Sequence, residues 1–387
     1  MNKTALFSIL VITYNRPALL RECLCSIAES TCQDFEVYVL DRGSEPPVQA
    51  LVEEFGERFH YVRSSQDVHL VDGANAVMAQ MKGQYFFHLA DDDVICSNCL
   101  QRVKEAFARH PECNVVQIGL CGYDWFTDPK LFDISFFSRL NEQPFDKNTI
   151  NLETVHNGRD LCLAEWETGA NVLIGRKTKQ KKAHTFLHPS CLFFRFLPLR
   201  ELAEKYNQGK IYLKPMWDLG AHGLIWYSQV VYLYAPLAII SENSPGRQCN
   251  SSYLRWRKEH FGHIPLKIGT LTSTFTETVL KLIKRYQLAP QKDVYVHPDL
   301  YFAMHDSIHA CHPRTVQTKA DLAAVRRMLW KELFLRPDVI LSNLWRRQQA
   351  RRKVRRGQQK DPRQDAAVHF PTITQWRKFV EKKFFTH

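Results

Sequence analysis

Three consecutive aspartates, Asp91, Asp92 and Asp93, have the residue type and the spacing that point most directly to chemistry. They follow the apolar, aromatic run from Tyr85 to Leu89, which is typical of a buried strand. Adjacent carboxylates repel one another unless a cation lies among them, and Mg2+ and Mn2+ prefer carboxylate oxygens together with substrate phosphates. The triplet therefore predicts a metal site that binds phosphate. An acidic turn that opens a helix from Cys96 to His110 explains the triplet equally well.

Strands and helices alternate in the first third of the chain, and this alternation determines where the aspartates lie. Apolar runs and helical spacing predict strands at 5–13, 35–40, 59–63 and 85–89, with helices at 17–30, 47–56 and 72–82 between them. Such alternation is typical of a doubly wound α/β sheet, whose ligand crevice lies beyond the carboxyl ends of the strands. Polar residues follow the first, second and fourth strands, at 13–16, 41–44 and 91–93. The sheet should gather them on one rim, which favours a binding site over an acidic turn.

Three segments also resemble a known family. They are ILVITYNRPALLRECLCSI, FEVYVLDRGS and GQYFFHLADDD. In this order and spacing they resemble the inverting family 2 glycosyltransferases, strongly over residues 5–110 and weakly over 185–245. The resemblance implies a GT-A type, Rossmann-like, doubly wound mixed sheet and a nucleotide-sugar donor. It also implies a Mn2+ or Mg2+ cofactor and a role in the synthesis of bacterial surface polysaccharide.

The resemblance implies that the rim loops bind the donor. The loop after the first strand matches the family's contacts to base and ribose, and Asn75 matches an asparagine in the helix before the acid strand. Asp41 matches the first acid of an Asp-Asp-Gly-Ser turn. Arg42 stands where the family has the acid that commonly contacts uracil, so a uridine donor is not implied. The residues expected at the donor are Thr13, Tyr14, Asn15, Arg16, Asp41, Arg42, Asn75, Asp91 and His188.

The acid motif departs from the family's usual Leu-Asp-Ala-Asp-Asp, because Ala90 replaces its first acid. In the matching register Asp92 is the metal ligand with Asp93 beside it, and Asp91 serves the ribose or the sugar. A register shifted by one residue pairs Asp91 with Asp93 instead. The sequence leaves both registers open.

Asp218 follows Trp217, opens a predicted helix, and resembles the family's catalytic base in its position. Inverting transfer needs a carboxylate within hydrogen-bond reach of the acceptor hydroxyl, and burial beside Trp217 would raise its pKa toward a useful value. The alternative is an acid that only stabilises a helix N-terminus. His188 and Ser190 lie in a segment, 183–206, that resembles the part of the family that closes the donor site. We therefore expect them near the sugar or the phosphates.

The composition of the 387 residues is that of a folded globular protein, with 45% hydrophobic and 24% charged residues. A formal net charge of +12 favours an anionic partner. No apolar run reaches the roughly 18 residues that a membrane-spanning helix needs. The 11 cysteines, Cys96 and Cys99 included, follow no disulfide-scaffold or zinc-ribbon spacing, which indicates a reducing cytoplasm.

We divide the chain into four parts: a nucleotide-sugar-binding half at 1–110, an acceptor-binding half with the base at 111–250, a helical C-terminal domain at 251–345 and a basic tail at 346–387. The tail contains RRQQARRKVRR, with seven basic residues in eleven. It is either a solvated segment or a surface helix on the anionic inner face of the plasma membrane. Nucleic acid is not expected as a partner, because no aromatic platform is interleaved with the basic residues.

The residues and the resemblance together predict a metal-dependent inverting glycosyltransferase. It would move a sugar from a nucleotide sugar to a hydroxyl of a glycan or of a lipid-linked acceptor. A nucleotidyltransferase should show a glycine-rich phosphate loop with a lysine near the first strand, and TYNRPALL has neither. The other alternative is a non-catalytic scaffold of the same fold that binds nucleotide or membrane, and Arg42 and Ala90 are compatible with it.

Overall fold

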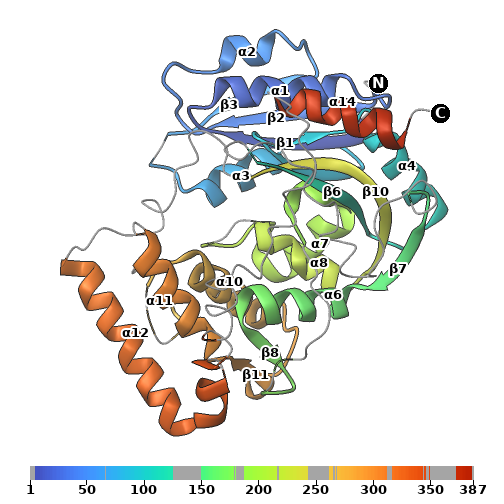
Figure 1. The fold of residues 1–387 in the computed structure, drawn as a ribbon. Coiled ribbons are helices and arrows are strands. Elements are labelled where there is room, and N and C mark those ends of the chain that lie inside the picture. The colour runs from blue at the N-terminus through green and yellow to red at the C-terminus, as the bar shows by residue number, and fades with distance from the viewer. Residues whose placement is uncertain are drawn as a thin grey trace.

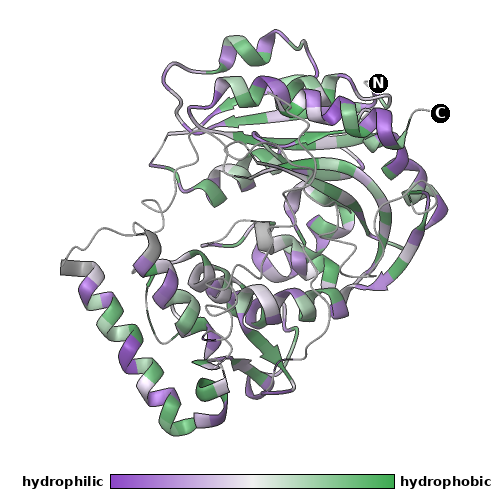
Figure 2. Ribbon diagram, in the orientation of Figure 1, coloured by the Kyte–Doolittle hydropathy of each residue, from purple (hydrophilic) through white to green (hydrophobic). Residues whose placement is uncertain are grey.

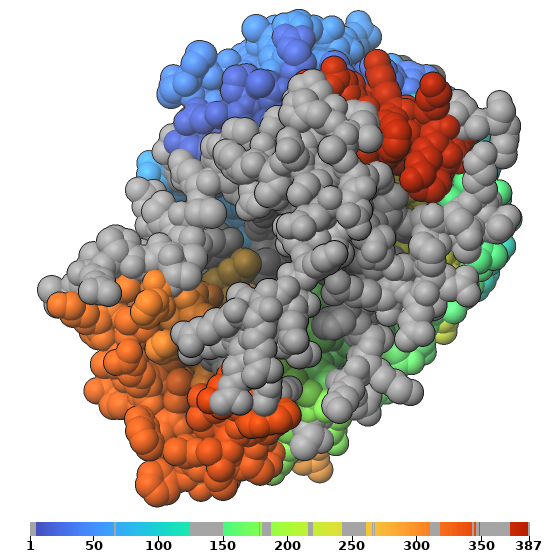
Figure 3. Space-filling view, in the orientation of Figure 1, coloured from blue at the N-terminus to red at the C-terminus, as the bar shows by residue number. Residues whose placement is uncertain are grey.

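The computed structural model describes residues 5–65, 67–124, 150–177, 179, 187–215, 218–242, 261–264, 266, 268–311, 316–342, 344, 345, 348 and 372–385. Across these ranges a mixed sheet with helices on both faces forms one part of the molecule, and helices after residue 270 form another (Figure 1). The blue N-terminal part and the orange helical part lie at opposite ends of the molecule (Figure 3). The predicted fold class, an α/β sheet followed by a mostly helical region, is confirmed.

Strands from both predicted halves form one sheet. They are β1 (Phe7–Thr13), β2 (Phe35–Asp41), β3 (Phe59–Arg63), β4 (Tyr85–Ala90), β5 (Val94–Ile95), β6 (Val115–Asp124), β7 (Glu153–Asn157), β9 (Leu192–Arg195) and β10 (Gln229–Glu242). Their order is β3-β2-β1-β4-β9-β6-β10-β5, with β7 beside β10. β1 is parallel to β2 and β4, whereas β9 is antiparallel to β4 and β6. Hydrophobic residues are concentrated in these strands (Figure 2), so the core follows the sheet.

The parallel register of the first strands brings the predicted rim together. Thr13, the last residue of β1, lies beside Asp41, the last residue of β2. On the other side of β1, Ile12 lies beside Ala90, which ends β4. The three polar loops that follow these strands therefore leave the sheet at one edge, as the alternation of strands and helices predicted.

The helices around the sheet bury one apolar face each. They are α1 (Pro17–Ala28), α2 (Gln49–Glu53), α3 (Leu70–Met78), α4 (Cys99–Arg109), α6 (Gly158–Glu165), α7 (Phe196–Asn207) and α8 (His222–Trp226). In α1, Pro17 occupies the first turn, where its missing N–H costs nothing, and Leu20, Leu24 and Ile27 are buried on the helical spacing that predicted this helix.

The aspartate triplet does not open a helix, so the alternative of an acidic helix start is wrong. Residues Val94 and Ile95 pair with β10 as β5, and the backbone N–H of Cys96 bonds to Leu237 O at 2.9 Å. The chain is therefore extended where the helix was expected to begin. α4 starts only at Cys99, with no acid in its first turn.

The C-terminal region consists of α10 (Leu271–Arg285), α11 (Asp299–Cys311) and α12 (Val316–Leu335), with a short strand pair, β8 (Val172–Ile174) and β11 (Val294–Val296). It packs closely on the segment Trp166–Ala170: a Cβ added to Gly169 would lie 2.2 Å from Cε1 of Phe275 in α10. None of the helices that the structure describes combines the length and the apolar character that crossing a bilayer requires.

The predicted basic tail differs from the structure in its last part. Residues Ile373–Phe384 form a helix, α14, that lies against α1 and beside β5 and β10 (Figure 1). Trp376 and Val380 are buried at helical spacing, a signal present in the sequence but hidden behind the basic run. Thr374 donates its backbone N–H and its hydroxyl to Glu22 at 3.0 and 2.8 Å. Of the run 346–356, only residue 348 lies among the described residues.

Loss of the N-terminal cap of α14 should destabilise the whole protein. The hydroxyl of Thr372 accepts a hydrogen bond from the backbone N–H of Gln375 at 3.2 Å. We expect Thr372→Ala to lower the free energy of unfolding by about 1 kcal/mol, measured by denaturant titration, and Thr372→Ser to restore it because serine keeps the acceptor oxygen. An unchanged midpoint in Thr372→Ala would mean that α14 folds independently of the sheet.

Candidate functional site

The aspartate triplet forms a tight, buried turn at the end of β4. The backbone N–H of Asp93 bonds to Ala90 O at 3.1 Å, which closes the turn. Asp91 is 1% exposed, Asp93 is 2% exposed and Asp92 is 9% exposed. Asp92 is thus the most accessible acid of the three, although its carboxylate also binds a neighbouring side chain.

Arg16 supplies a cation that these carboxylates need. Its guanidinium contacts both carboxylate oxygens of Asp91, with Nε 3.2 Å from Oδ2, and its Nη1 lies 3.0 Å from Asp92 Oδ2. Burial opposes the charge of Arg16, but Asp91 and Asp92 together raise its pKa. The loop after β1 and the loop after β4 are therefore joined by an ion pair whose arginine is only 18% exposed.

Asp91 is held in an environment that disfavours its charge. Burial raises its pKa to about 7, and the neighbouring carboxylate of Asp92 adds to the rise, while Arg16 and Thr13 oppose it. Thr13 donates its hydroxyl to Asp91 Oδ2 at 2.7 Å. The pKa of Asp91 therefore depends on Arg16, Thr13 and Asp92 together.

Asp93 connects the acid turn to Ser190, just before β9, and to the end of β10. Its Oδ2 accepts from Ser190 Oγ at 2.5 Å and its Oδ1 accepts from the backbone N–H of Ser241 at 2.9 Å. Ser190 follows His188, whose Nδ1 accepts the backbone N–H of Ser190 at 3.3 Å. The segment predicted to close the donor site therefore lies against the acid turn. Ser241, near the end of β10, was not predicted as part of the site.

The loop after β2 is organised around Asp41, which is fully buried. Its carboxylate accepts from the backbone N–H of Ser44 at 2.8 Å and from the hydroxyl of Tyr61 at 2.9 Å. Burial works to raise the pKa of Asp41, but these hydrogen bonds together lower it below its usual value. Asn15, with φ of 53°, accepts the backbone N–H of Glu45 at 2.8 Å, which ties the first loop to the second.

Tyr14 begins the loop after β1, and Arg42 begins the loop after β2. The backbone N–H of Arg42 bonds to Thr13 O at 3.0 Å. Burial lowers the pKa of Arg42, and Tyr14 acts in the opposite direction. Its Nε is buried and, among the described residues, has no hydrogen-bond partner. A guanidinium thus occupies the place where the resemblance implies an acid.

Asn75 binds protein backbone on both sides of its amide. Its Nδ2 donates to Tyr212 O at 3.2 Å, and its Oδ1 accepts the backbone N–H of Tyr212 at 2.9 Å. The Tyr212 hydroxyl lies 2.8 Å from Nδ1 of His88 in β4. Burial lowers the pKa of His88 to about 3, with His188 adding to the effect, so His88 is neutral. Sequence reasoning missed Tyr212 and His88, although a histidine within an aromatic strand is itself an unusual feature.

Asp218 begins a short 3-10 turn, η4 (Asp218–Ala221), just before α8. The described part of this residue is its backbone, and Trp217 lies outside the described residues. The turn packs tightly on the segment before it: a Cβ added to Gly220 would lie 2.1 Å from Ile211 O. The turn that begins at Asp218 therefore packs on the backbone of Tyr212, whose hydroxyl contacts His88 in β4.

The three aspartates do not converge on one point. Among the described residues, the one group of three metal-binding side chains with all ligand atoms within 4.8 Å is His110, Glu112 and Cys113, after α4. A metal held at the acid turn would therefore take part of its ligands from a substrate, as Mg2+ commonly does.

The part of the chain that contains these loops matches a known protein family. A model of the family described as Glycosyl transferase family 2 matches residues 8–201, about half of the chain, including the loops after β1, β2 and β4. A PGL/p-HBAD biosynthesis glycosyltransferase of Mycobacterium bovis is 32% identical over 116 residues, which cover 29% of this chain and 45% of that protein. A glycosyltransferase of Rickettsia prowazekii is 25% identical over 119 residues, covering 31% and 36%. The matched region thus spans less than half the length of either relative.

Two solved structures are similar at low identity. S. aureus TarS (1-349) in complex with UDP-GlcNAc has a TM-score of 0.42 and 15% identity, covering 85% of this chain and 75% of that chain. Mannosyltransferase PcManGT from Pyrobaculum calidifontis, in complex with GDP-Man and Mn2+, has a TM-score of 0.41 and 13% identity, covering 85% and 81%.

Proposed function

The chain belongs to glycosyl transferase family 2, and from that premise we propose that it transfers a sugar from a nucleotide-sugar donor to a hydroxyl of a glycan or of a lipid-linked acceptor, with inversion at the anomeric carbon. The observation that carries the proposal is the meeting of three loops on one rim, where Thr13 and Arg16 bind Asp91 and Asp92. A role in surface polysaccharide synthesis, a cytoplasmic location, and association of the run 346–356 with an anionic membrane belong to the same proposal.

In this proposal Asp218 is the general base. The acceptor oxygen forms its bond to the anomeric carbon while the bond to the nucleoside diphosphate breaks, and the bonding electrons leave with the diphosphate. Asp218 takes the proton of the hydroxyl, which makes the oxygen a better nucleophile. Arg16 and Arg42, on the rim, supply positive charge for the departing diphosphate.

The residues of the acid turn fit a divalent ion that is shared with the substrate. Carboxylate oxygens are the ligands that Mg2+ and Mn2+ prefer, and Asp92 is the acid with the most exposed carboxylate. Asp92 would hold the ion, and Asp93 stays a predicted second ligand although both of its oxygens accept hydrogen bonds. When bound, the ion would neutralise charge on the diphosphate. In the absence of the ion, Arg16 compensates part of the negative charge of the acids, so the turn can fold before the ion binds.

The proposal can be tested by calorimetry with a panel of nucleoside diphosphates, in the presence and absence of Mn2+. We expect one nucleotide to bind more tightly than the rest, and to gain affinity from the metal. If no nucleotide bound under any condition, the chain would not be a nucleotide-sugar enzyme.

Replacement of Asp92 should remove the metal-dependent part of nucleotide binding. In Asp92→Ala the affinity measured with Mn2+ should fall to the value measured without it, because the carboxylate that holds the ion is gone. The matched control is Glu57→Ala, which removes an exposed acid in the turn before β3. This variant should bind the nucleotide more tightly with Mn2+ than without it, as the parent does. A full metal-dependent gain in Asp92→Ala would assign the ion to other ligands.

A non-catalytic nucleotide-binding protein is a second candidate, because Arg16 already pairs with two of the acids. The two candidates differ in turnover. Release of nucleoside diphosphate from a bound nucleotide sugar would favour the enzyme, whereas tight binding without release, with any acceptor supplied, would favour the binding protein.

A further inference from the structure

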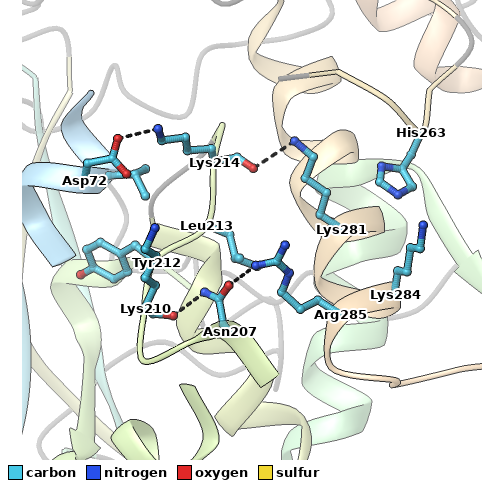
Figure 4. Close-up of a pocket in the computed structure, with 11 residues that line it drawn as sticks. Asp72, Asn207, Lys210, Tyr212, Leu213, Lys214, His263, Lys281, Lys284 and Arg285 are labelled. Atoms are coloured by element: carbon cyan, nitrogen blue, oxygen red, sulfur yellow. Dashed lines mark hydrogen bonds and ion pairs between the residues drawn. The ribbon is translucent and has the colours of Figure 1, made fainter. Parts of the chain in front are cut away.

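A basic cavity of about 560 Å3 lies between α3 and α10, beside the segment 210–214 (Figure 4). The side chains of α10 enter it from one side, opposite those of the segment 210–214. The charged residues of its lining comprise five cations and one carboxylate. They are Lys210, Lys214, Lys281, Lys284, Arg285 and Asp72. His263 also lines the cavity, and its Nδ1 lies 2.9 Å from Oε1 of Glu277.

The positive charges in this cavity are only partly compensated by the protein. Lys214 pairs with Asp72 at 2.5 Å, and Lys281 lies 3.8 Å from Glu277. The Glu277 carboxylate also accepts the backbone N–H groups of 262–264. Among the described residues, Lys210 and Lys284 form no ion pair. The cavity therefore carries excess positive charge that an anion would neutralise.

Lys281 is the most buried lysine of this lining whose pKa departs from its ordinary value. Burial lowers its pKa, and the nearby charges of Arg285 and Lys214 add to the lowering, while Glu277 opposes it. Its Nζ donates to Lys214 O at 3.4 Å, so the ammonium group of α10 points toward the segment on the other side of the cavity (Figure 4). Cations held this close repel one another, and a ligand with several anionic oxygens would relieve the repulsion.

The cavity shares a wall with the element that carries the proposed base. Tyr212 and Leu213 line it, and Gly220 of η4 packs directly on the backbone of Ile211 and Tyr212. Tyr212 also contacts His88 in the acid strand through its hydroxyl. The segment 211–214 therefore lies next to the turn that begins at Asp218, so a ligand bound in the cavity would lie close to that turn.

We propose that this cavity binds a phosphate group of the acceptor, so that the acceptor is a phosphate-bearing glycan or lipid presented to Asp218. The inference rests on the proposed transferase function and narrows its substrate class. Phosphate fits because lysine ammonium groups bind it as point charges and an arginine adds a planar pair of donors. The donor's diphosphate would offer the same chemistry, and the experiment below separates the two sources.

The test is calorimetry of the full chain with inorganic pyrophosphate, first alone and then with the preferred nucleoside diphosphate at saturation. We expect pyrophosphate to bind in both cases with similar affinity. The double variant Lys281→Gln/Lys284→Gln should bind pyrophosphate about tenfold more weakly and keep its affinity for the nucleotide within about twofold. The control Lys104→Gln/Lys331→Gln removes the same charge from exposed positions outside the cavity and should change neither affinity.

Each other outcome overturns the inference in a distinct way. If saturating nucleotide displaced pyrophosphate, the cavity would belong to the donor. If the nucleotide bound and pyrophosphate did not, the acceptor site would fail while the transferase proposal stood. If neither bound, both would fail. If circular dichroism shows that the double variant does not fold, the affinities for pyrophosphate and for the nucleotide are measured instead in the single variant Lys284→Gln, which changes an exposed position.

Discussion

Asp218→Asn should reduce sugar transfer by about two to four orders of magnitude and leave nucleotide binding unchanged. Asparagine has nearly the shape of aspartate but cannot accept the proton of the acceptor hydroxyl. The loss should therefore fall on the chemical step. The measurement is the initial rate of product formation at saturating donor, together with the nucleotide dissociation constant by calorimetry.

The control for this change is Asp338→Asn, which removes a negative charge at an exposed position after α12. It should transfer sugar at the parent rate. Transfer by Asp218→Asn at the parent rate would end the assignment of the base. A loss of nucleotide binding in Asp218→Asn would instead show that the residue supports the donor site.

Arg16→Met should be the most destabilising single change on the rim. It leaves Asp91 and Asp92 close together and buried without their cation, and breaking a buried pair in this way costs about 3 kcal/mol. Methionine keeps much of the length and volume of the side chain, so the lost charge dominates the effect. The measurement is the free energy of unfolding from denaturant titration at neutral pH.

Two variants control the interpretation of Arg16→Met. Arg21→Met breaks the pair with Glu54 on the exposed face of the same helix, and it should change stability little because water solvates both groups. Arg16→Lys keeps the positive charge but loses the bidentate contact with Asp91. Its free energy of unfolding should therefore lie between those of the parent and of Arg16→Met. Equal effects of Arg16→Met and Arg21→Met would show that the rim pair contributes no more than a surface pair.

The rim could be predicted from the sequence because parallel strands impose it. Alternating apolar runs and helical spacing gave β1 to β4 within a few residues, and the strand order then forces the loops after β1, β2 and β4 to one edge. The place of Thr13 beside Asp41 follows from that geometry alone. Residues at the ends of strands are therefore the part of a site that a sequence reveals best.

The partners of the rim residues could not be predicted, because they come from distant parts of the chain. Ser190 precedes β9, which is inserted antiparallel between β4 and β6, and Ser241 reaches Asp93 because β10 pairs with β5; no local pattern specifies either arrangement. Arg16 was expected at the donor, and its pairing with Asp91 depends on a rotamer that packing selects. The amide of Asn75 was likewise expected at the donor, whereas both its ends bind Tyr212.

The docking of α14 has a consequence for how the protein is made. The helix covers the face of the first half that includes Glu22, which bonds to Thr374, and Ser97, whose backbone N–H bonds to Glu381 at 2.6 Å. During synthesis this face stays uncovered until the ribosome has passed residue 384. At about 5–20 residues per second the wait after β6 emerges is on the order of tens of seconds. The contacts of Glu22 and Ser97 with α14 therefore form only after the rest of the chain has been made.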